Sequence, residues 1–268
     1  MFFVEVRSRC LPEAPVFGKA AAAGVHTEPV TAEHGEPVAQ ILVVDDEKPL
    51  AGMVAAYLSR EGYQTRLAHT GPEAVAAALE HAPDIVILDL GLPGIDGVEV
   101  CRKIRTFSDC YIIIVTARQD EIDKLIGLSV GADDYMTKPF SVRELVARVQ
   151  TVLRRPRTPT GATPYVEEPA RAFGDLRVDV AGHEVHVAGI LIELTPTEFD
   201  ILAILTSRPK LAFSRQQILD AVWGEDWVGD DHVVDVHVAH LRQKLGDDPT
   251  TPRYVRTVRG VGYRMGPG

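Results

Sequence analysis

The sequence predicts an α/β protein: a doubly wound five-stranded parallel sheet, followed by a smaller domain of three helices and a β-hairpin. Two observations predict this order. Over residues 39–154, short apolar segments alternate with amphipathic helical segments, which is typical of βαβ units and of a parallel sheet covered on both faces. Beyond residue 172, helical spacing recurs three times and the chain closes on a glycine-containing strand pair.

The strands and helices of the first domain can be placed from periodicity. Each expected strand is a short apolar or β-branched run, and these runs cover residues 40–45, 65–68, 84–89, 111–116 and 134–137. Each expected helix has apolar residues three and four apart, and these segments cover residues 50–58, 72–81, 96–105, 120–130 and 141–154. Five such repeats predict a compact doubly wound domain.

The second domain begins with short strands over residues 173–187. Thr195, Pro196 and Glu198 then form a capping box with proline at the first helical position, which predicts a helix start. Two further helices and a final hairpin are expected over residues 214–223, 233–245 and 257–264. Three helices with a C-terminal hairpin predict a winged helix-turn-helix domain.

Composition narrows the class of protein. The 268 residues suit two domains, and no apolar run approaches the length needed to cross a membrane. Three cysteines, without a CxxC pair, indicate neither a disulfide framework nor a metal knuckle, so a reducing cytoplasm fits. The net charge of −10 argues against a generally polycationic nucleic-acid binder. Any DNA binding must therefore use a local patch.

Two segments lack periodicity and separate or precede the domains. Residues 1–38 are expected to be a disordered N-terminal extension, because they lack periodicity and are rich in Ala, Pro, Gly and Glu. They do not predict a secretory signal, because charged residues and prolines interrupt any apolar stretch. An equally open alternative is a later translation start at Val25 or Val30. Residues 155–171 are rich in proline and predict a linker. The two domains are thus expected over residues 39–154 and 172–268.

Polar side chains follow the strands of the expected parallel sheet. Asp45 and Asp46 end the first strand, Asp89 the third and Thr116 the fourth, and Lys138 follows the fifth. If the strand order is 2-1-3-4-5, the three carboxylates converge at the carboxyl edge of the sheet, where ligands bind in open α/β folds. Such crowding favours a bound cation, and hard oxygen ligands suit Mg²⁺. Asp89 is then the candidate nucleophile for an aspartyl-phosphate.

Four motifs in this domain resemble a response-regulator receiver domain, which is flavodoxin-like in fold. They are VVDDE, DLGLPGIDG, VTAR and GADDYMTKPF, at residues 43–47, 89–97, 115–118 and 131–140. The resemblance implies that Asp89 accepts a phosphoryl group from a histidine kinase. It further implies Mg²⁺ held by three carboxylates and a backbone carbonyl, those of Asp45, Asp46, Asp89 and Gly91.

The same resemblance assigns the remaining pocket residues. Thr116 is the switch hydroxyl, Tyr135 the switch aromatic and Lys138 the phosphate-binding lysine, and the Lys138–Pro139 bond is expected to be cis. Regulators of this kind dimerise through ion pairs on the face of helix 4, strand 5 and helix 5. The matching positions here are Lys124, Asp133, Asp134, Glu144, Arg148 and Arg155.

The C-terminal half resembles the OmpR/PhoB-type effector domain. The matching segments are LTPTEF, FSRQQILDAVW and TVRGVGYR, at residues 194–199, 213–223 and 257–264. The resemblance implies that helix 233–245 enters the major groove and that Arg259 in the wing reaches the minor groove. Residues 232–264 carry six basic residues against three acids, a local basic surface. The expected DNA contacts are His232, Val233, His237, His240, Arg242, Lys244, Thr257 and Arg259.

Together these features predict a cytoplasmic two-component transcription regulator that is not an enzyme. Phosphorylation of Asp89 would drive homodimerisation, binding to head-to-tail promoter half-sites, and contact with RNA polymerase. One rival is a magnesium-dependent phosphatase that uses Asp89, although Leu90 and Gly91 follow where such sites carry an acid. The other rival is a regulator that works without phosphate, which the complete set of pocket residues disfavours.

Overall fold

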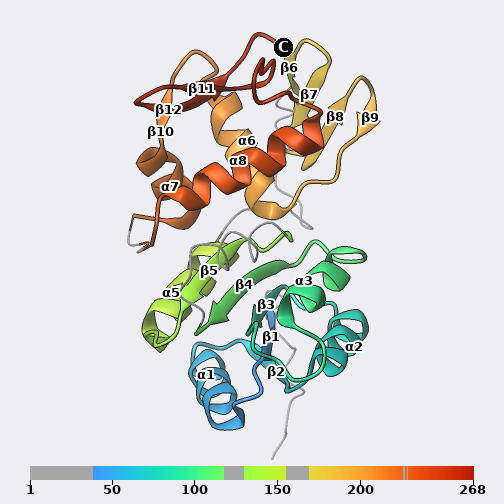
Figure 1. Ribbon diagram of the computed structural model, residues 1–268, viewed down its shortest axis with the longest axis vertical. Helices are drawn as coiled ribbons and strands as arrows, with labels where there is room; N and C mark the ends of the chain where they lie inside the picture. Colours follow the sequence, from blue (N-terminus) through green and yellow to red (C-terminus); the bar gives the residue numbers. More distant parts are fainter. Residues whose placement is uncertain (1–38, 118–129, 155–168, 226, 228) are drawn as a thin grey trace, which may run out of the picture. The chain divides into compact units, whose positions relative to one another are not determined.

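The structure is a computed structural model that describes residues 39–117, 130–154, 169–225, 227 and 229–268 (Figure 1). Most of the expected helix 120–130, all but the last residues of the linker 155–171, and the extension 1–38 lie outside the described residues. Val130, the last residue of that expected helix, lies in a turn. Within the described residues, no helix is long and apolar enough to span a membrane.

The N-terminal part alternates strands and helices as the periodicity predicted. Its strands are β1 (Gln40–Val44), β2 (Gln64–Ala68), β3 (Ile85–Leu88), β4 (Tyr111–Thr116) and β5 (Asp134–Thr137). Its helices are α1 (Lys48–Arg60), α2 (Gly71–His81), α3 (Gly97–Arg105) and α5 (Val142–Leu153). The strands form one parallel sheet in the order β2-β1-β3-β4-β5, which confirms the predicted fold class.

Helices cover this sheet on both faces. Side chains that alternate along each strand divide between two cores, because successive residues of a strand point to opposite faces. Ile41, Val43 and Ile113 pack with α1 and α5, and Leu42 and Ile112 pack with α2 and α3. Burial on both faces explains why β1, β3 and β4 are continuous apolar runs rather than alternating ones. The loops that follow the strands form the carboxyl edge of the sheet.

The C-terminal part contains helices α6 (Pro196–Ser207), α7 (Arg215–Trp223) and α8 (His232–Leu245). Its strands are β6 (Arg171–Phe173), β7 (Leu176–Asp179), β8 (Glu184–Val187), β9 (Ile190–Leu191), β10 (Phe213–Ser214), β11 (Val255–Val258) and β12 (Gly262–Met265). They form a four-stranded antiparallel sheet, β6-β7-β8-β9, and a three-stranded sheet, β10-β12-β11.

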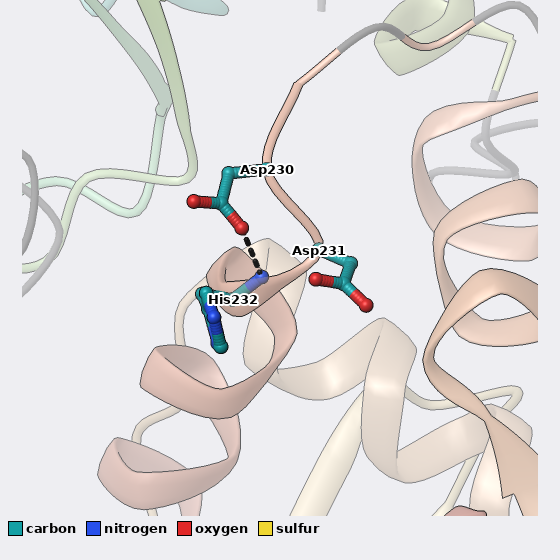
Figure 2. Close-up of side chains that lie close together, drawn as sticks. All are labelled: Asp230, Asp231 and His232. Atoms are coloured by element: carbon teal, nitrogen blue, oxygen red, sulfur yellow. Dashed lines mark hydrogen bonds between the residues drawn. The ribbon is translucent and has the colours of Figure 1, made fainter.

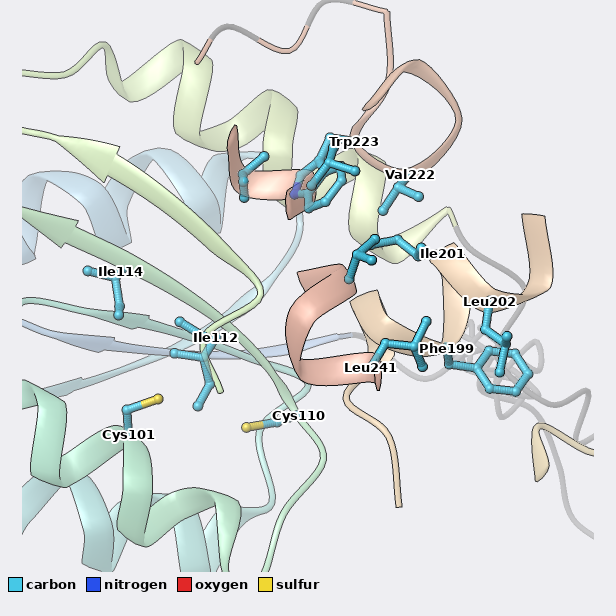
Figure 3. Close-up of a cluster of buried hydrophobic side chains, with 14 of the residues drawn as sticks. Cys101, Cys110, Ile112, Ile114, Phe199, Ile201, Leu202, Val222, Trp223 and Leu241 are labelled. Carbon is cyan, nitrogen blue, oxygen red and sulfur yellow. The ribbon is translucent and has the colours of Figure 1, made fainter. Parts of the chain in front are cut away.

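Apolar side chains from all three C-terminal helices form one core. Phe199, Ile201 and Leu202 of α6 pack in it with Trp223 of α7 and Leu241 of α8 (Figure 3). Each of these side chains is at most 4% exposed. The amphipathic stripe of α8 therefore faces this core.

Local sequence signals fix where α6 and α7 begin. The capping box at the start of α6 is present: Thr195 accepts from the Glu198 N–H, and Glu198 accepts from the Thr195 N–H at 2.8 Å. Ser214 and Gln217 form a second capping box at the start of α7. Both helix starts are thus encoded within four residues.

Candidate functional site

The carboxyl ends of β1 and β3 bring three acidic side chains together. Asp45 directly follows β1 and Asp89 directly follows β3, and the two strands are hydrogen-bonded neighbours. Carboxylate oxygens of Asp45, Asp46 and Asp89 lie within 4.8 Å of one another. Asp45 and Asp89 are each 6% exposed, whereas Asp46 is exposed. The cluster predicted from strand order is therefore present in this part of the chain.

Lys138 connects two of these carboxylates, those of Asp45 and Asp89. Its ammonium nitrogen lies 2.8 Å from Asp89 Oδ2 and 2.9 Å from Asp45 Oδ2. It also lies 3.2 Å from Glu47 Oε1, a contact that the sequence interpretation missed. Glu47 stands in the same acidic motif as Asp45, so the cluster of charge was the signal that could have identified it. Lys138 thus places a cation among several carboxylates.

Burial and mutual repulsion shape the electrostatics of the pocket. Burial raises the pKa of Asp45, and the nearby Asp89 charge raises it further, although hydrogen bonds from Lys138 and the Glu47 N–H oppose this shift. Burial alone would lower the pKa of Lys138. Hydrogen bonds to Asp89 and Asp45 outweigh burial, so this pKa lies above its usual value. The lysine therefore stays charged and partly compensates the acids.

Glycines allow the Asp89 loop to take its position. A Cβ at Gly97 would lie 2.3 Å from the Asp89 carbonyl oxygen and 2.7 Å from Leu90 Cα, so α3 can begin this close to the loop only with glycine there. Gly91 donates its N–H to Asp89 Oδ1 at 3.1 Å. Lys138 and Gly91 therefore each bind a different oxygen of the Asp89 carboxylate.

Thr116 and Tyr135 lie on the two strands next to the pocket. Thr116 ends β4 and is 1% exposed, and its carbonyl accepts the Lys138 N–H at 2.8 Å. Tyr135 lies on β5 opposite Ile114 of β4 and is half-buried. The Lys138–Pro139 peptide is cis, as expected. The hydroxyl, the aromatic side chain and the lysine thus come from adjacent strands.

The chemistry of the donors suits a small divalent cation. The pocket offers oxygen ligands from three carboxylates beside the backbone of Gly91, and Mg²⁺ prefers such hard ligands. A second group of potential ligands, Asp230, Asp231 and His232, lies at the start of α8 (Figure 2). All three are exposed, and the His232 N–H donates to Asp230 Oδ1 at 3.0 Å. We assign no metal site to that exposed group.

Comparison with known proteins identifies both halves of the chain. Residues 41–150 match the response regulator receiver domain, and residues 189–265 match the family described as transcriptional regulatory protein, C terminal. The DNA-binding response regulator MtrA of Mycolicibacterium smegmatis is 45% identical over 230 residues, covering 85% of this chain and 97% of MtrA. The chain belongs to the response-regulator family.

Other relatives agree with this family. The sensory transduction protein RegX3 of Mycolicibacterium smegmatis is 45% identical over 227 residues, covering 84% of this chain and 98% of RegX3. A solved structure of a RitR mutant is 30% identical, with a TM-score of 0.68, and it covers 86% of this chain and 100% of that chain. A receiver domain joined to this C-terminal family confirms the OmpR/PhoB-type arrangement that the sequence motifs predicted.

Several residues expected on the dimer face of the receiver are buried. Asp133 is 0% exposed and accepts from Arg105, from the Ile112 N–H at 2.9 Å and from the Thr197 N–H of α6 at 3.2 Å. Lys124 and Arg155 lie outside the described residues. The sequence interpretation missed Arg105, because its partner Asp133 was assigned to an exposed ion pair.

Asp134 and Arg148 also differ from the exposed ion pairs that were expected. Arg148 is 6% exposed and binds both carboxylate oxygens of Asp134 at 2.9 Å, as well as Glu144 at 2.6 Å. The indole of Trp227 covers this pair. Its N–H donates to Asp134 Oδ1 at 3.3 Å, and the Arg148 guanidinium lies 5.2 Å from the ring centroid. Trp227 was not among the expected site residues.

The effector domain presents some of the expected DNA contacts and buries others. His232, Lys244, Thr257 and Arg259 are exposed, and Arg259 lies in the turn between β11 and β12. His237 is 1% exposed and Val233 is 6% exposed, which corrects the expectation that they contact DNA. Both lie beside the apolar stripe of α8, and the His237 ring contacts Trp223.

Arg242 and His240 occupy intermediate positions on α8. The Arg242 guanidinium binds the Val255 carbonyl at 2.8 Å and the Thr257 hydroxyl at 2.8 Å, so it ties α8 to β11. His240 is half-buried, and burial lowers its pKa. The exposed positive charge on this surface therefore comes from fewer residues than the sequence suggests.

Proposed function

We propose that this protein is a two-component transcription regulator that accepts a phosphoryl group on Asp89 and then binds promoter DNA as a dimer. The observation that carries the proposal is the nearly buried Asp89 carboxylate at the carboxyl edge of the receiver sheet, which shares the Lys138 ammonium with Asp45. A carboxylate in this setting is a suitable acceptor, because the neighbouring cation can bind the oxygens of an incoming phosphoryl group.

The proposed transfer is a displacement at phosphorus. A carboxylate oxygen of Asp89 attacks the phosphorus of a phosphohistidine on a kinase, forming an O–P bond while the N–P bond breaks and its electron pair leaves with the imidazole. Lys138 is placed to compensate the added negative charge. Asp45, Asp46, Asp89 and the Gly91 carbonyl would hold Mg²⁺, which when bound supplies charge compensation to the phosphoryl oxygens.

Phosphorylation would then change the neighbouring strands. Thr116 would bond the new phosphoryl oxygens and Tyr135 would turn inward, altering the face that includes β5 and α5. We propose that receivers pair through this face and that two effector domains bind repeated half-sites near RNA polymerase. The exposed contacts proposed for DNA are His232, Lys244, Thr257 and Arg259.

An acetyl phosphate assay tests the acceptor. The unchanged protein should gain the mass of one phosphoryl group in the presence of Mg²⁺, and Asp89→Asn should not. Asp109→Asn, which alters an exposed aspartate of the same domain, is the matched control and should react normally. Retained phosphorylation of Asp89→Asn would refute the acceptor assignment.

The proposal includes what the protein does not do. We infer that it does not hydrolyse external phosphate esters. We also infer that it works in the cytoplasm, where a kinase and DNA are both accessible. Its two domains, residues 39–154 and 172–268, would be joined by a linker. The relative MtrA is named a DNA-binding response regulator, which supports this inference. Multiple-turnover hydrolysis of a phosphate ester that is lost in Asp89→Asn would favour a phosphatase instead.

A further inference from the structure

Asp235 of α8 joins three other side chains of the effector domain. Its Oδ1 accepts from the Arg215 Nε at 2.7 Å and from the Tyr263 hydroxyl at 2.6 Å. Its Oδ2 lies 3.2 Å from His232 Nδ1. Arg215 is the first residue of α7 and Tyr263 belongs to β12, so this one carboxylate links α7, α8 and the wing hairpin.

We propose that Arg215 contacts a DNA phosphate and that Asp235 is the residue that positions it. This inference rests on the proposed function, because it assigns a new contact to the same DNA-binding surface. Arg215 was not among the contacts expected from the sequence, where it follows a capping serine and carries no further signal.

The contacts of Arg215 place it between the two elements that would enter the grooves. Its guanidinium bonds Asp235 of α8 and lies 5.5 Å from the ring centroid of Tyr263 in the wing hairpin. The ring of Tyr263 has Arg242 as a second cationic neighbour, at 5.6 Å. Arg215 is therefore held where α8 and the wing meet.

The guanidinium of Arg215 retains donors for a phosphate. Among the described residues, Asp235 is the one acceptor of its hydrogen bonds, and that bond uses Nε. The two terminal nitrogens can form the paired hydrogen bonds with which arginine binds phosphate oxygens. Its side chain is 30% exposed, enough for such a contact. Arg242 differs, because Nε and one terminal nitrogen of that side chain bind β11.

The position of Arg215 on α7 also favours an anion. The residue stands at the first turn of a nine-residue helix, where backbone N–H groups and the helix dipole attract negative charge. Asp235 holds the guanidinium in one place before DNA arrives, which lowers the conformational entropy lost on binding. A fixed cation at this junction would set the position of α7 on the DNA backbone.

The role of Asp235 can be tested by whether Asp235→Asn raises or lowers the affinity for DNA. As a negative charge beside DNA, Asp235 should weaken binding, so a purely electrostatic role predicts that Asp235→Asn binds DNA more tightly. The positioning role predicts the opposite result, because Arg215 loses its charged partner. The probe is a duplex enriched from a random-sequence library by the phosphorylated protein, with affinity measured at several salt concentrations.

Arg215→Ala should lower affinity by roughly tenfold and reduce the magnitude of the salt slope by about 0.9 per bound protomer. Arg177→Ala is the matched control, because Arg177 is an exposed arginine on β7 of the other sheet, and it should change neither quantity. Asp235→Asn should weaken binding by several-fold, and adding it to Arg215→Ala should cause little further loss.

Two outcomes would overturn the inference: Arg215→Ala behaving like Arg177→Ala, or Asp235→Asn binding more tightly. Arg259→Ala separates this failure from failure of the proposed function. If the unchanged protein binds the duplex and Arg259→Ala weakens binding, the proposed function stands whatever Arg215 does. Thermal unfolding of each variant checks that it folds. If Asp235→Asn does not fold, the salt dependence of DNA binding by Arg215→Ala and Arg215→Lys decides whether Arg215 contacts a phosphate.

Discussion

The Lys138 ammonium lies within 3 Å of both Asp89 and Asp45, so one cation joins the buried carboxylates that follow β3 and β1. Lys138→Met should therefore lower the free energy of unfolding of the receiver by about 3 kcal/mol at pH 7, because it leaves buried charges without that partner. Urea unfolding without added metal measures the loss. Lys103→Met, which alters an exposed lysine of α3, should have little effect. Equal stability of the two variants would contradict the compensating role.

Adding a methyl group at Gly91 should slow loss of the phosphoryl group. A Cβ there would lie 3.7 Å from both Asp89 carboxylate oxygens, an ordinary van der Waals distance. Gly91→Ala should therefore fold normally while it shields the acyl phosphate from water. The decay of phosphoprotein on a phosphate-affinity gel measures the lifetime, with Gly52→Ala in α1 as the control. If the phosphoryl group is lost equally fast from Gly91→Ala and from Gly52→Ala, a side chain at residue 91 does not shield the acyl phosphate from water.

Gly97 should not tolerate even a methyl group. The Cβ of Gly97→Ala would approach the Asp89 carbonyl oxygen to 2.3 Å, and the obstacle is backbone, which cannot move aside cheaply. We expect Gly97→Ala to destabilise the receiver by roughly 1–3 kcal/mol and to reduce phosphorylation of Asp89. Gly52→Ala, which meets nothing within 4 Å, should be neutral or stabilising in urea unfolding.

Affinity for DNA should fall as pH rises through the pKa of His232. A hydrogen bond to Asp235 and the charge of Asp230 raise this pKa above its ordinary value of 6.5, and Asp231 adds to the effect. The positive charge is therefore largest well below pH 6.5 and is lost as pH rises through the raised pKa. Titration of binding from pH 6 to 8 should show this fall, and His232→Gln should flatten it.

A matched histidine separates this effect from general titration. His186→Gln, on β8, should keep the pH dependence of DNA binding. His240 should contribute less to it than His232, because burial lowers the pKa of His240. An unchanged pH profile in His232→Gln would exclude His232 as the titrating group.

Sequence patterns predicted the elements better than the exposure of individual side chains. Strand runs and capping residues act locally, so the receiver sheet and the start of α6 at Thr195 follow from a few neighbouring residues. Burial of His237 depends on helix rotation within a packed core, and periodicity leaves the edge of an apolar stripe ambiguous. The contacts of Asp133 and Arg215 join residues far apart in the chain, which no local pattern encodes.

Removing the Trp227 indole should promote pairing of unphosphorylated receivers. The indole occupies Asp134 and Arg148, two residues proposed for the dimer face. Trp227→Ala would uncover the Asp134–Arg148 ion pair and remove a cation–π contact worth roughly 0.5–2 kcal/mol. Sedimentation equilibrium should show more dimer at equal concentration, and Tyr57→Ala, which removes an exposed aromatic side chain from α1, should not. If Trp227→Ala and the unchanged protein show the same fraction of monomer, the Trp227 indole does not restrain pairing of the receivers.

Trp227 has a consequence for how the response depends on protein abundance. A side chain tethered in the same polypeptide competes at an effective concentration of about millimolar, whereas a second molecule is present only at its cellular level. A regulator present at low concentration would therefore remain monomeric until phosphorylation shifts the monomer–dimer equilibrium. Overproduction of the protein alone would then cause dimerisation without phosphorylation. The response to the kinase therefore depends on the number of copies of this protein per cell.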